Sequence, residues 1–316
     1  MKLCIVGFGA IGKLHAEHIV STENAQLYAV CDIQKDSLDK ASEKYDVVTY
    51  NDYDTCLDDE NIECVHICTP HYLHFEMIEK ALAKGKYVVC EKPVVMTKEE
   101  LDKLYNLQGA DRVCVVMQNR LNPCVIKMKE IISSGILGGV KAIKGIVTWE
   151  RDADYYGSSP WRGKWATEGG GVLINQSIHT LDLMCYLAGE VNNVRSVMSN
   201  FSLPSIEVED SCMARLEFKS GAVGVFFATN AYGANSPVEL EVSLQKCKMR
   251  YIDGKLYVNG EFAEEDARTV IGKNYWGMAH RKIFEKFYND GICFGIDDVK
   301  NTMKTMFSMY DGFKTH

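Results

Sequence analysis

The chain has 316 residues, of which 47% are hydrophobic and 25% charged, and its formal net charge at pH 7 is −8. This length exceeds the usual extent of one hydrophobic core and predicts two domains. The composition excludes a disordered or fibrous chain, and the acidic balance argues against nucleic-acid binding. No apolar segment is long enough to cross a bilayer, so we expect neither a nucleic acid nor a membrane as partner.

The first third of the chain alternates short apolar segments with helical patterns. Strands are predicted at residues 2–6, 27–31, 64–68, 87–90 and 113–116, and helices at 11–20, 37–45, 73–83 and 101–107. Strict alternation of strand and helix predicts right-handed βαβ units in a doubly wound parallel sheet.

The pattern changes near residue 123. A helix at 123–133 is followed by a strand at 141–149, a polar aromatic loop at 151–168, a helix at 171–188, and strands at 191–201, 208–218, 222–229 and 238–244. Helical spacing returns from about residue 278. We expect an α/β chain with an N-terminal domain at 1–120 and a C-terminal α+β domain at 121–316. The second domain would hold a large, mostly antiparallel open sheet, and its last helices would pack back towards the first domain.

Twelve cysteines are present, and half of them fall in or next to the predicted strands of the first domain. There a thiol acts as a small buried hydrophobic group. No C-x-x-C pair occurs, which argues against a zinc ribbon or a dithiol redox motif. We therefore expect reduced, core-filling cysteines in a cytoplasmic protein.

The segment between the first strand and the first helix reads G-x-G-x-x-G. Its glycines permit a tight turn, close approach of a pyrophosphate and close packing of helix on strand. The N–H groups at the helix start can bind the phosphates. We expect cofactor contacts from Gly7, Gly9, Ala10, Ile11 and Gly12.

Asp32 ends the second strand, 20 residues after Gly12. An acid at this spacing receives the ribose hydroxyls of NAD. A carboxylate repels a 2′-phosphate, and only Lys35 nearby could offset that repulsion. The cofactor is therefore expected to be NAD, with NADP less favoured.

Four further segments belong together. They are T-P-H-Y-L-H at 69–74, E-K-P at 91–93, G-G-G-V-L-I-N-Q-S-I-H at 169–179, and a loop with Y-Y at 155–156 and W-R-G at 161–163. With the glycine turn, this set closely resembles the Gfo/Idh/MocA family, the glucose–fructose oxidoreductase and inositol dehydrogenase group. The resemblance covers nearly the whole chain.

The resemblance implies an NAD-dependent oxidoreductase that transfers a hydride between nicotinamide and a secondary alcohol of a sugar, sugar acid or inositol. It also implies a homodimer or homotetramer formed through the C-terminal sheet. An NAD-dependent glycoside hydrolase of the same fold and a non-catalytic NAD-binding regulator are the alternatives. Retention of Lys92 and His179 argues against the regulator. The sugar and the attacked carbon stay open.

The resemblance also assigns roles to particular residues. Lys92 and His179 are expected to be catalytic, and the family often has Asp at the position of Asn175. Asn175 cannot titrate, so we expect it to orient the substrate and His179. The segments that follow the predicted strands at 64–68 and 87–90 would lie by the cofactor, which adds Thr69, Pro70, His74, Glu91 and Lys92 to its contacts.

Elementary chemistry agrees with these roles. A neutral imidazole suits removal of the hydroxyl proton, and a lysine just beyond a strand end can stabilise a developing alkoxide. On the predicted helix at 171–188, Asn175, His179 and Asp182 share one polar stripe, so His179 is expected to face a cleft.

The substrate site is expected to draw on the aromatic loop and the domain cleft. Tyrosine rings stack on sugar faces, and an arginine can bind a carboxylate or phosphate bidentately. The expected substrate contacts are Lys92, Arg120, Tyr156, Trp161, Arg162, Asn175 and His179. The H-x-x-H patterns at 15–18 and 71–74 lack a matching cysteine or carboxylate, so we expect no metal.

Overall fold

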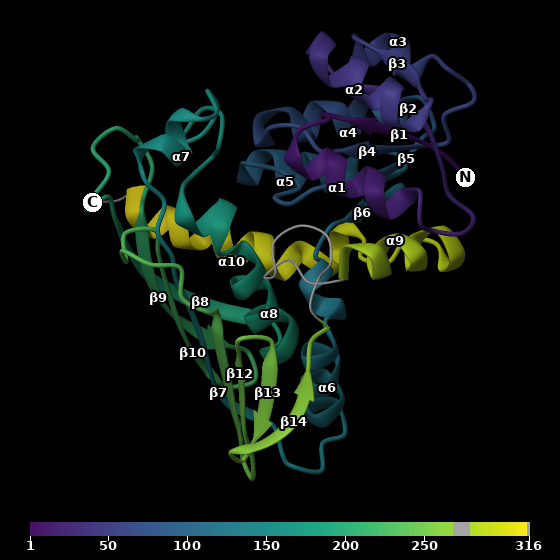
Figure 1. Ribbon diagram of the computed structural model, residues 1–316. Helices are drawn as coiled ribbons and strands as arrows, with labels where there is room; N and C mark the ends of the chain where they lie inside the picture. Colours follow the sequence, from purple (N-terminus) through teal and green to yellow (C-terminus); the bar gives the residue numbers. More distant parts are fainter. Residues whose placement is uncertain (268–278, 315–316) are drawn as a thin grey trace. The chain divides into compact units, whose positions relative to one another are not determined.

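The computed structural model describes residues 1–267 and 279–314, which form two compact units, each built on its own sheet (Figure 1). The first unit contains residues 1–118 and, of the described residues, 279–299; the second contains 119–267 and 300–314. The division lies close to residue 120, but helix α9 (Ala279–Asp290) belongs to the first unit, where it packs on α1 (Ala10–Ile19). The expected second domain of 121–316 is therefore not one continuous segment. No described helix is both long and apolar enough to cross a membrane.

The first unit is a six-stranded, fully parallel sheet in the order β3-β2-β1-β4-β5-β6, which confirms the predicted Rossmann-type fold. The strands are β1 (Lys2–Val6), β2 (Gln26–Cys31), β3 (Val48–Tyr50), β4 (Cys64–Ile67), β5 (Tyr87–Cys90) and β6 (Val113–Val115). The helices are α1, α2 (Lys35–Tyr45), α3 (Tyr53–Leu57), α4 (His74–Ala83), α5 (Lys98–Asn106) and α9. Strand order reverses between β1 and β4, and ligands of open parallel sheets bind at such a point.

Cysteines fill the core, as expected. All twelve are free thiols and eleven of them are buried. Cys4, Cys64 and Cys90 are completely buried in neighbouring strands β1, β4 and β5. Central strands of a parallel sheet are covered on both faces, so uninterrupted apolar sequences are what they require.

The second unit holds an eight-stranded sheet in the order β14-β13-β12-β11-β7-β10-β9-β8. Its strands are β7 (Val140–Thr148), β8 (Val191–Ser199), β9 (Ser211–Phe218), β10 (Val223–Thr229), β11 (Glu239–Leu244), β12 (Lys248–Ile252), β13 (Lys255–Val258) and β14 (Glu261–Glu265). Among the strand pairs of the described residues in this sheet, only β7–β10 is parallel, so the predicted mostly antiparallel sheet is confirmed.

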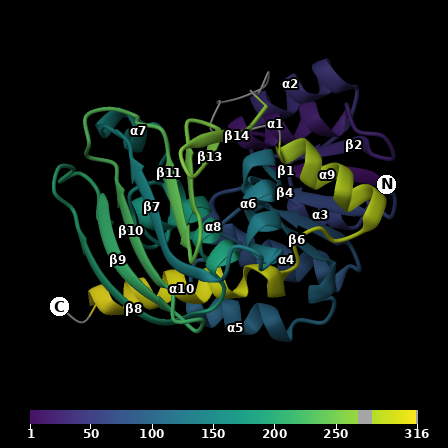
Figure 2. The same ribbon diagram turned by 90° about the horizontal axis from the view of Figure 1, so that it is seen from below.

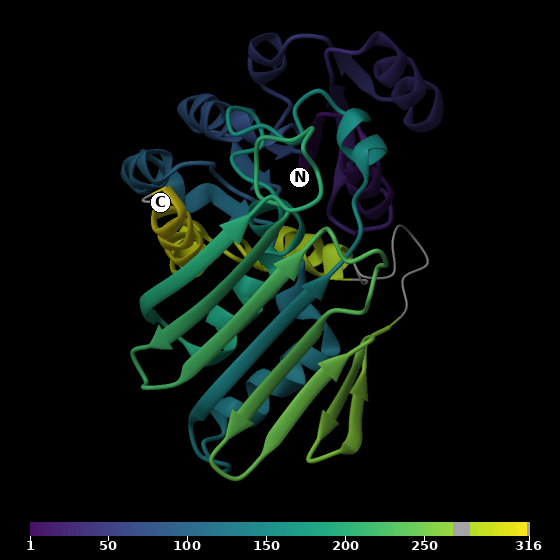
Figure 3. The same cartoon turned by 90° about the vertical axis from the view of Figure 1, so that its left-hand side faces the viewer.

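Helices cover one face of this sheet and leave the other face open (Figures 2 and 3). They are α6 (Pro123–Ser133), α8 (Ile178–Ala188) and the second-unit part of α10 (Ile296–Lys314). Helix α8 approaches β7 closely because Gly145 has no side chain. A Cβ there would lie 2.6 Å from the sulfur of Met184 and 2.9 Å from Cγ2 of Thr180. This close contact with β7 fixes the position of α8, the helix that carries His179.

The predicted helix at 171–188 is interrupted. Residues Val172–Gln176 form a π-helical turn, and α8 begins only at Ile178. Both the N–H and the hydroxyl of Ser177 donate to the carbonyl of Val172, at 2.9 and 2.7 Å, which widens this turn. Side chains before and after Ser177 therefore do not follow one helical stripe.

Candidate active site

The expected cofactor residues of the first unit lie along one edge of the parallel sheet. The glycine turn follows β1, Asp32 follows β2, Thr69 follows β4, and Lys92 follows β5. These four strands are neighbours in the sheet, so their carboxyl ends meet at the same edge.

Two glycines of the turn are required by the fold itself. Gly7 has a φ of 88°, and a Cβ on it would lie 2.9 Å from the carbonyl oxygen of Cys68. A Cβ on Gly12 would collide with the carbonyl of Gly7. Gly9 differs, because no atom lies within 4 Å of the place its Cβ would take, and the residue is exposed. The missing side chain at Gly9 thus leaves open space that a ligand can use.

That space lies at the N-terminus of α1. The first N–H groups of a helix have no partner within the helix, and the first turn of α1 carries no acidic residue that would compete for them. Ala10 is exposed and Ile11 is partly exposed. The turn therefore fits the diphosphate of a dinucleotide.

Asp32 is tied to the same turn. One of its carboxylate oxygens accepts the N–H of Phe8 at 2.6 Å, and the other accepts the N–H of Gln34 at 2.8 Å. The residue stays partly exposed. An acceptor held in this way suits the ribose hydroxyls.

His74 lies inside the protein and connects two of the strand ends. Its Nδ1 lies 2.7 Å from the carbonyl of Pro93 and its Nε2 lies 2.9 Å from the carbonyl of Thr69. Its side chain is completely buried, and this burial lowers its pKa. His74 thus holds the loops that present Thr69 and Lys92, and its ring offers no exposed face to a cofactor.

Glu91 and Lys92 differ in their exposure. The carboxylate of Glu91 is buried, with Oε1 3.1 Å from Nε2 of His15, while Oε2 accepts the N–H of Lys92 at 3.2 Å. Lys92 is partly exposed. A contact from Glu91 to a cofactor would therefore come from its backbone.

In the second unit, the three glycines allow a tight crossing of the chain over Glu209. Gly169 and Gly170 have φ values of 83° and 157°. A Cβ on Gly170 would collide with the hydroxyl of Tyr310, and a Cβ on Gly171 with the carbonyl of Glu209. The buried carboxylate of Glu209 accepts the N–H of Gly171 at 2.9 Å and that of Leu173 at 3.1 Å. No motif in the sequence marks Glu209.

Asn175 and His179 stand out by their exposure. Among residues 171–188, only these two and Tyr186 are partly exposed, and the rest are buried. The amide nitrogen of Asn175 donates to Glu168 at 2.5 Å. Glu168 is completely buried, and its other oxygen accepts the N–H of Gly163 at 2.5 Å. Sequence reasoning missed Glu168, which stands seven residues before Asn175 in an irregular loop.

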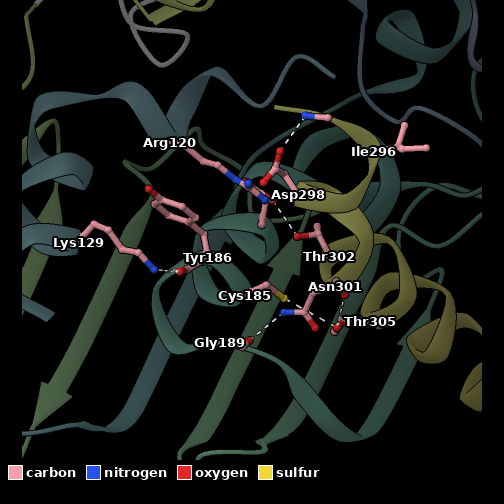
Figure 4. Close-up of polar contacts among 12 residues, drawn as sticks. Arg120, Lys129, Cys185, Tyr186, Gly189, Ile296, Asp298, Asn301, Thr302 and Thr305 are labelled. Atoms are coloured by element: carbon pink, nitrogen blue, oxygen red, sulfur yellow. Dashed lines mark hydrogen bonds and ion pairs between the residues drawn. The ribbon is translucent and has the colours of Figure 1, made fainter. Parts of the chain in front are cut away.

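Asp182 does not belong to an exposed polar stripe with Asn175 and His179, contrary to the prediction from the sequence. This residue is buried and its carboxylate pairs with Arg120, from Nε to Oδ2 at 2.8 Å and from Nη2 to Oδ1 at 2.5 Å. The Arg120 guanidinium also lies 4.9 Å from the ring of Tyr186, and Figure 4 shows these two side chains side by side. The expected role of Arg120 in substrate binding is thus replaced by an internal ion pair.

The aromatic loop also differs from expectation. Tyr156 packs in a small core with Ile206 and Val208, and its hydroxyl accepts from Asn230 at 3.0 Å, so its ring is no open stacking surface. Its neighbour Tyr155 is partly exposed.

The ring of Tyr155 is flanked by two arginines. The guanidinium carbons of Arg162 and Arg151 lie 4.4 and 5.3 Å from the ring centre. Arg162 also lies 5.5 Å from the ring of Trp161, and both residues are partly exposed. Arg162 and Trp161 thus remain at the surface of the loop, where Tyr155, rather than the expected Tyr156, is the tyrosine that lies beside them.

Two family models match the chain. Residues 1–119 match the oxidoreductase family with an NAD-binding Rossmann fold, and residues 125–250 match the GFO/IDH/MocA C-terminal domain. The first unit is accordingly an NAD-binding domain, in agreement with the open space at Gly9.

Similar proteins point the same way. The chain is 29% identical to levoglucosan dehydrogenase of Pseudarthrobacter phenanthrenivorans over 61% of this chain and 56% of that protein, which is less than two thirds of its length. It is 28% identical to myo-inositol 2-dehydrogenase of Thermotoga maritima over 76% of this chain and 72% of that protein. The WlbA dehydrogenase of Bordetella pertussis, solved with NADH and UDP-GlcNAcA, shares the fold with a TM-score of 0.87 at 24% identity, over 99% of this chain and 96% of that chain. The chain belongs to the Gfo/Idh/MocA family of oxidoreductases.

Proposed function

We propose that the protein is an NAD-dependent dehydrogenase or reductase acting on a secondary alcohol of a sugar, sugar acid or inositol. The observation that carries this proposal is the exposure of Asn175 and His179 on an otherwise buried segment of the second unit. A polar pair that emerges from a buried element is suited to contact a ligand. Two similar proteins are named levoglucosan dehydrogenase and myo-inositol 2-dehydrogenase, which supports a sugar or inositol as the substrate.

Each residue has a defined task in this proposal. Bound NAD supplies the hydride acceptor. His179 takes the proton of the substrate hydroxyl, and Lys92 donates a hydrogen bond to the reacting oxygen. Asn175 orients the substrate, while Asp32 and the glycine turn hold the cofactor. The partly exposed side chains of Trp161 and Arg162 contribute to sugar specificity.

The test is a panel of polyols, aldoses, uronates, glycosides and nucleotide sugars with NAD, followed by NADH absorbance. We expect one of these classes to give NADH. The variants His179→Ala and Lys92→Ala should each lower turnover at least ~100-fold with the fold intact. Lys103→Ala, on the exposed face of α5, is the control and should behave as wild type.

The outcomes separate the candidate functions. Release of an aglycone without net NADH would favour a glycoside hydrolase, and NAD binding without turnover on any of these substrates would favour a regulator. Near-normal turnover of either alanine variant would remove that residue from the mechanism.

We further propose that copies of the chain associate through the open face of the second-unit sheet. Val197, Met213 and Val225 lie on that face with exposures of 66%, 53% and 49%. Exposed apolar side chains gathered on one sheet face are typical of an interface. Light scattering should show a dimer or tetramer, and Met213→Glu should dissociate it. A monomeric wild type would contradict this proposal.

We also propose a cytoplasmic location, because the free thiols of the described cysteines fit a reducing compartment.

A further inference from the structure

The first unit contains a buried group of histidines that the proposed reaction does not use. His15 on α1, Glu91 at the end of β5, and His280 on α9 meet beneath the loop that carries Lys92. Their exposures are 0%, 6% and 1%. Three separate elements thus direct ligand-type side chains to one point in the interior.

The spacing of the three side chains is compatible with a metal site. Oε1 of Glu91 lies 3.1 Å from Nε2 of His15 and 3.6 Å from Nε2 of His280, and one ligand atom from each residue falls within 4.8 Å of the others. Ligand atoms at about 2.0–2.1 Å from a tetrahedral Zn²⁺ are about 3.4 Å apart. The observed distances lie on either side of this value.

The surroundings also suit a metal. His15 Nδ1 lies 2.9 Å from Nδ1 of His66, and Nε2 of His66 lies 2.7 Å from the hydroxyl of Tyr288. With a metal on Nε2, His15 carries its proton on Nδ1 and donates to His66, which carries its own on Nε2 and donates to Tyr288. Each imidazole keeps one proton. This series of hydrogen bonds orients the His15 ring, as the hydrogen-bond partners of metal-bound histidines do.

The charge balance is consistent with this arrangement. Burial opposes ionisation of Glu91, but hydrogen bonds from His15 and His280 outweigh it and hold the pKa of its carboxyl well below the usual value. A buried carboxylate is best stabilised by a nearby cation.

We propose that His15, Glu91 and His280 bind one transition-metal dication, for which Zn²⁺ fits best, with water as a further ligand. The two imidazoles favour Zn²⁺ over Mg²⁺ and Ca²⁺, which prefer oxygen ligands alone, and a carboxylate is an accepted third ligand of Zn²⁺. The metal fastens α9 and α1 to the strand end that precedes Lys92. The sequence alone predicts no metal, because the H-x-x-H pattern at 15–18 has no matching arrangement of further ligands in the chain; folding brings Glu91 and His280 to His15.

Tag-free protein, stripped with a chelator, reconstituted with ZnCl₂ and desalted, tests the proposal by mass-spectrometric metal analysis. We expect about one zinc per chain and a higher melting temperature. His280→Gln should reduce the bound zinc at least tenfold. His18→Gln is the matched control, since His18 is equally buried on α1 but lies outside the ligand set, and it should keep its zinc.

X-ray absorption of the zinc-loaded wild type provides a readout that needs no variant. We expect two imidazole nitrogens and oxygen at about 2.0–2.1 Å, without sulfur. A sulfur ligand, which nearby Cys68 would supply, would overturn the proposed ligand set. Zinc uptake far below one per chain, or uptake by His280→Gln equal to wild type, would overturn the site itself.

Discussion

Asn175 donates a 2.5 Å hydrogen bond from its side-chain amide to the completely buried carboxylate of Glu168. Where the family often has an acid, this chain pairs an amide with an acid that comes from the preceding loop. A carboxylate has no hydrogen to donate and can only accept hydrogen bonds. The NH₂ group of Asn175, and not its carbonyl oxygen, must therefore face Glu168. The orientation of the Asn175 amide is therefore fixed before substrate binds.

We predict that Glu168→Gln raises the KM for the sugar at least about tenfold, since a hydrogen bond to a charged group contributes about 1.5–3 kcal/mol. The affinity for NAD should not change, because Glu168 belongs to the second unit. Steady-state kinetics and NAD titration measure the two effects. Glu207→Gln, an exposed acid nearby in the same unit, is the control. An unchanged KM in Glu168→Gln would contradict a positioning role for Glu168.

The glycine turn allows packing and ligand binding to be separated. Gly9→Val should fold with a melting temperature close to wild type, since its φ of −74° is allowed for valine and no atom lies within 4 Å of its Cβ position. Its affinity for NAD should fall at least tenfold, because the side chain fills the space of the pyrophosphate. Gly12→Val should instead unfold at a lower temperature. Thermal melting measures the stability of both variants, and fluorescence titration measures their affinity for NAD. Tight NAD binding by Gly9→Val would show that the cofactor binds elsewhere.

The sequence predicted those parts of the fold that local pattern determines. Strands β1, β2, β4 and β5 are short apolar segments with buried inner residues, and each was expected within one or two residues of its observed bounds. The strands β12, β13 and β14 were missed because they are short and have at most one buried residue each, so they carry little apolar alternation.

The site residues that belong to a local sequence motif were predicted. Those that act through contacts between distant parts of the chain were missed. The G-x-G-x-x-G turn has a local signature. In contrast, Glu209 acts on Gly171 from 38 residues away, and Glu168 acts on Asn175 across an irregular loop. The wide turn before α8 depends on Ser177, and it separates His179 from the stripe that a regular helix would give.

The buried pair of Arg120 and Asp182 should govern stability. Both side chains are at most 4% exposed, and Oδ1 of Asp182 also accepts from Thr302 at 2.8 Å. Asp182→Asn leaves the Arg120 guanidinium buried without its counter-charge, which should lower the free energy of unfolding by about 3–5 kcal/mol. Urea denaturation measures this loss. The double variant Arg120→Met with Asp182→Leu should be more stable than Asp182→Asn, since it removes both charges; a double variant as unstable as Asp182→Asn would show that the pair itself contributes stability.

Glu209 should make stability depend on pH. Burial raises the pKa of its carboxyl to about 7, although Leu173, Gly171 and Tyr310 donate hydrogen bonds to it. The folded protein then binds a proton that the unfolded chain releases near pH 4.5. The stabilisation from this proton is fully present below pH 4.5 and is lost as pH rises to about 7, by up to about 3 kcal/mol at 1.36 kcal/mol per pKa unit.

Glu209→Gln isolates this contribution, because an amide occupies the same space and does not titrate. Urea denaturation of wild type and variant at pH 5, 6, 7 and 8 gives the difference in unfolding free energy as a function of pH. We expect wild type to lose stability relative to the variant between pH 5 and 7 and to run parallel to it above pH 8. Parallel curves over the whole range would mean that the donors around Glu209 keep it ionised, and its carboxylate would then serve only to hold the chain at Gly171.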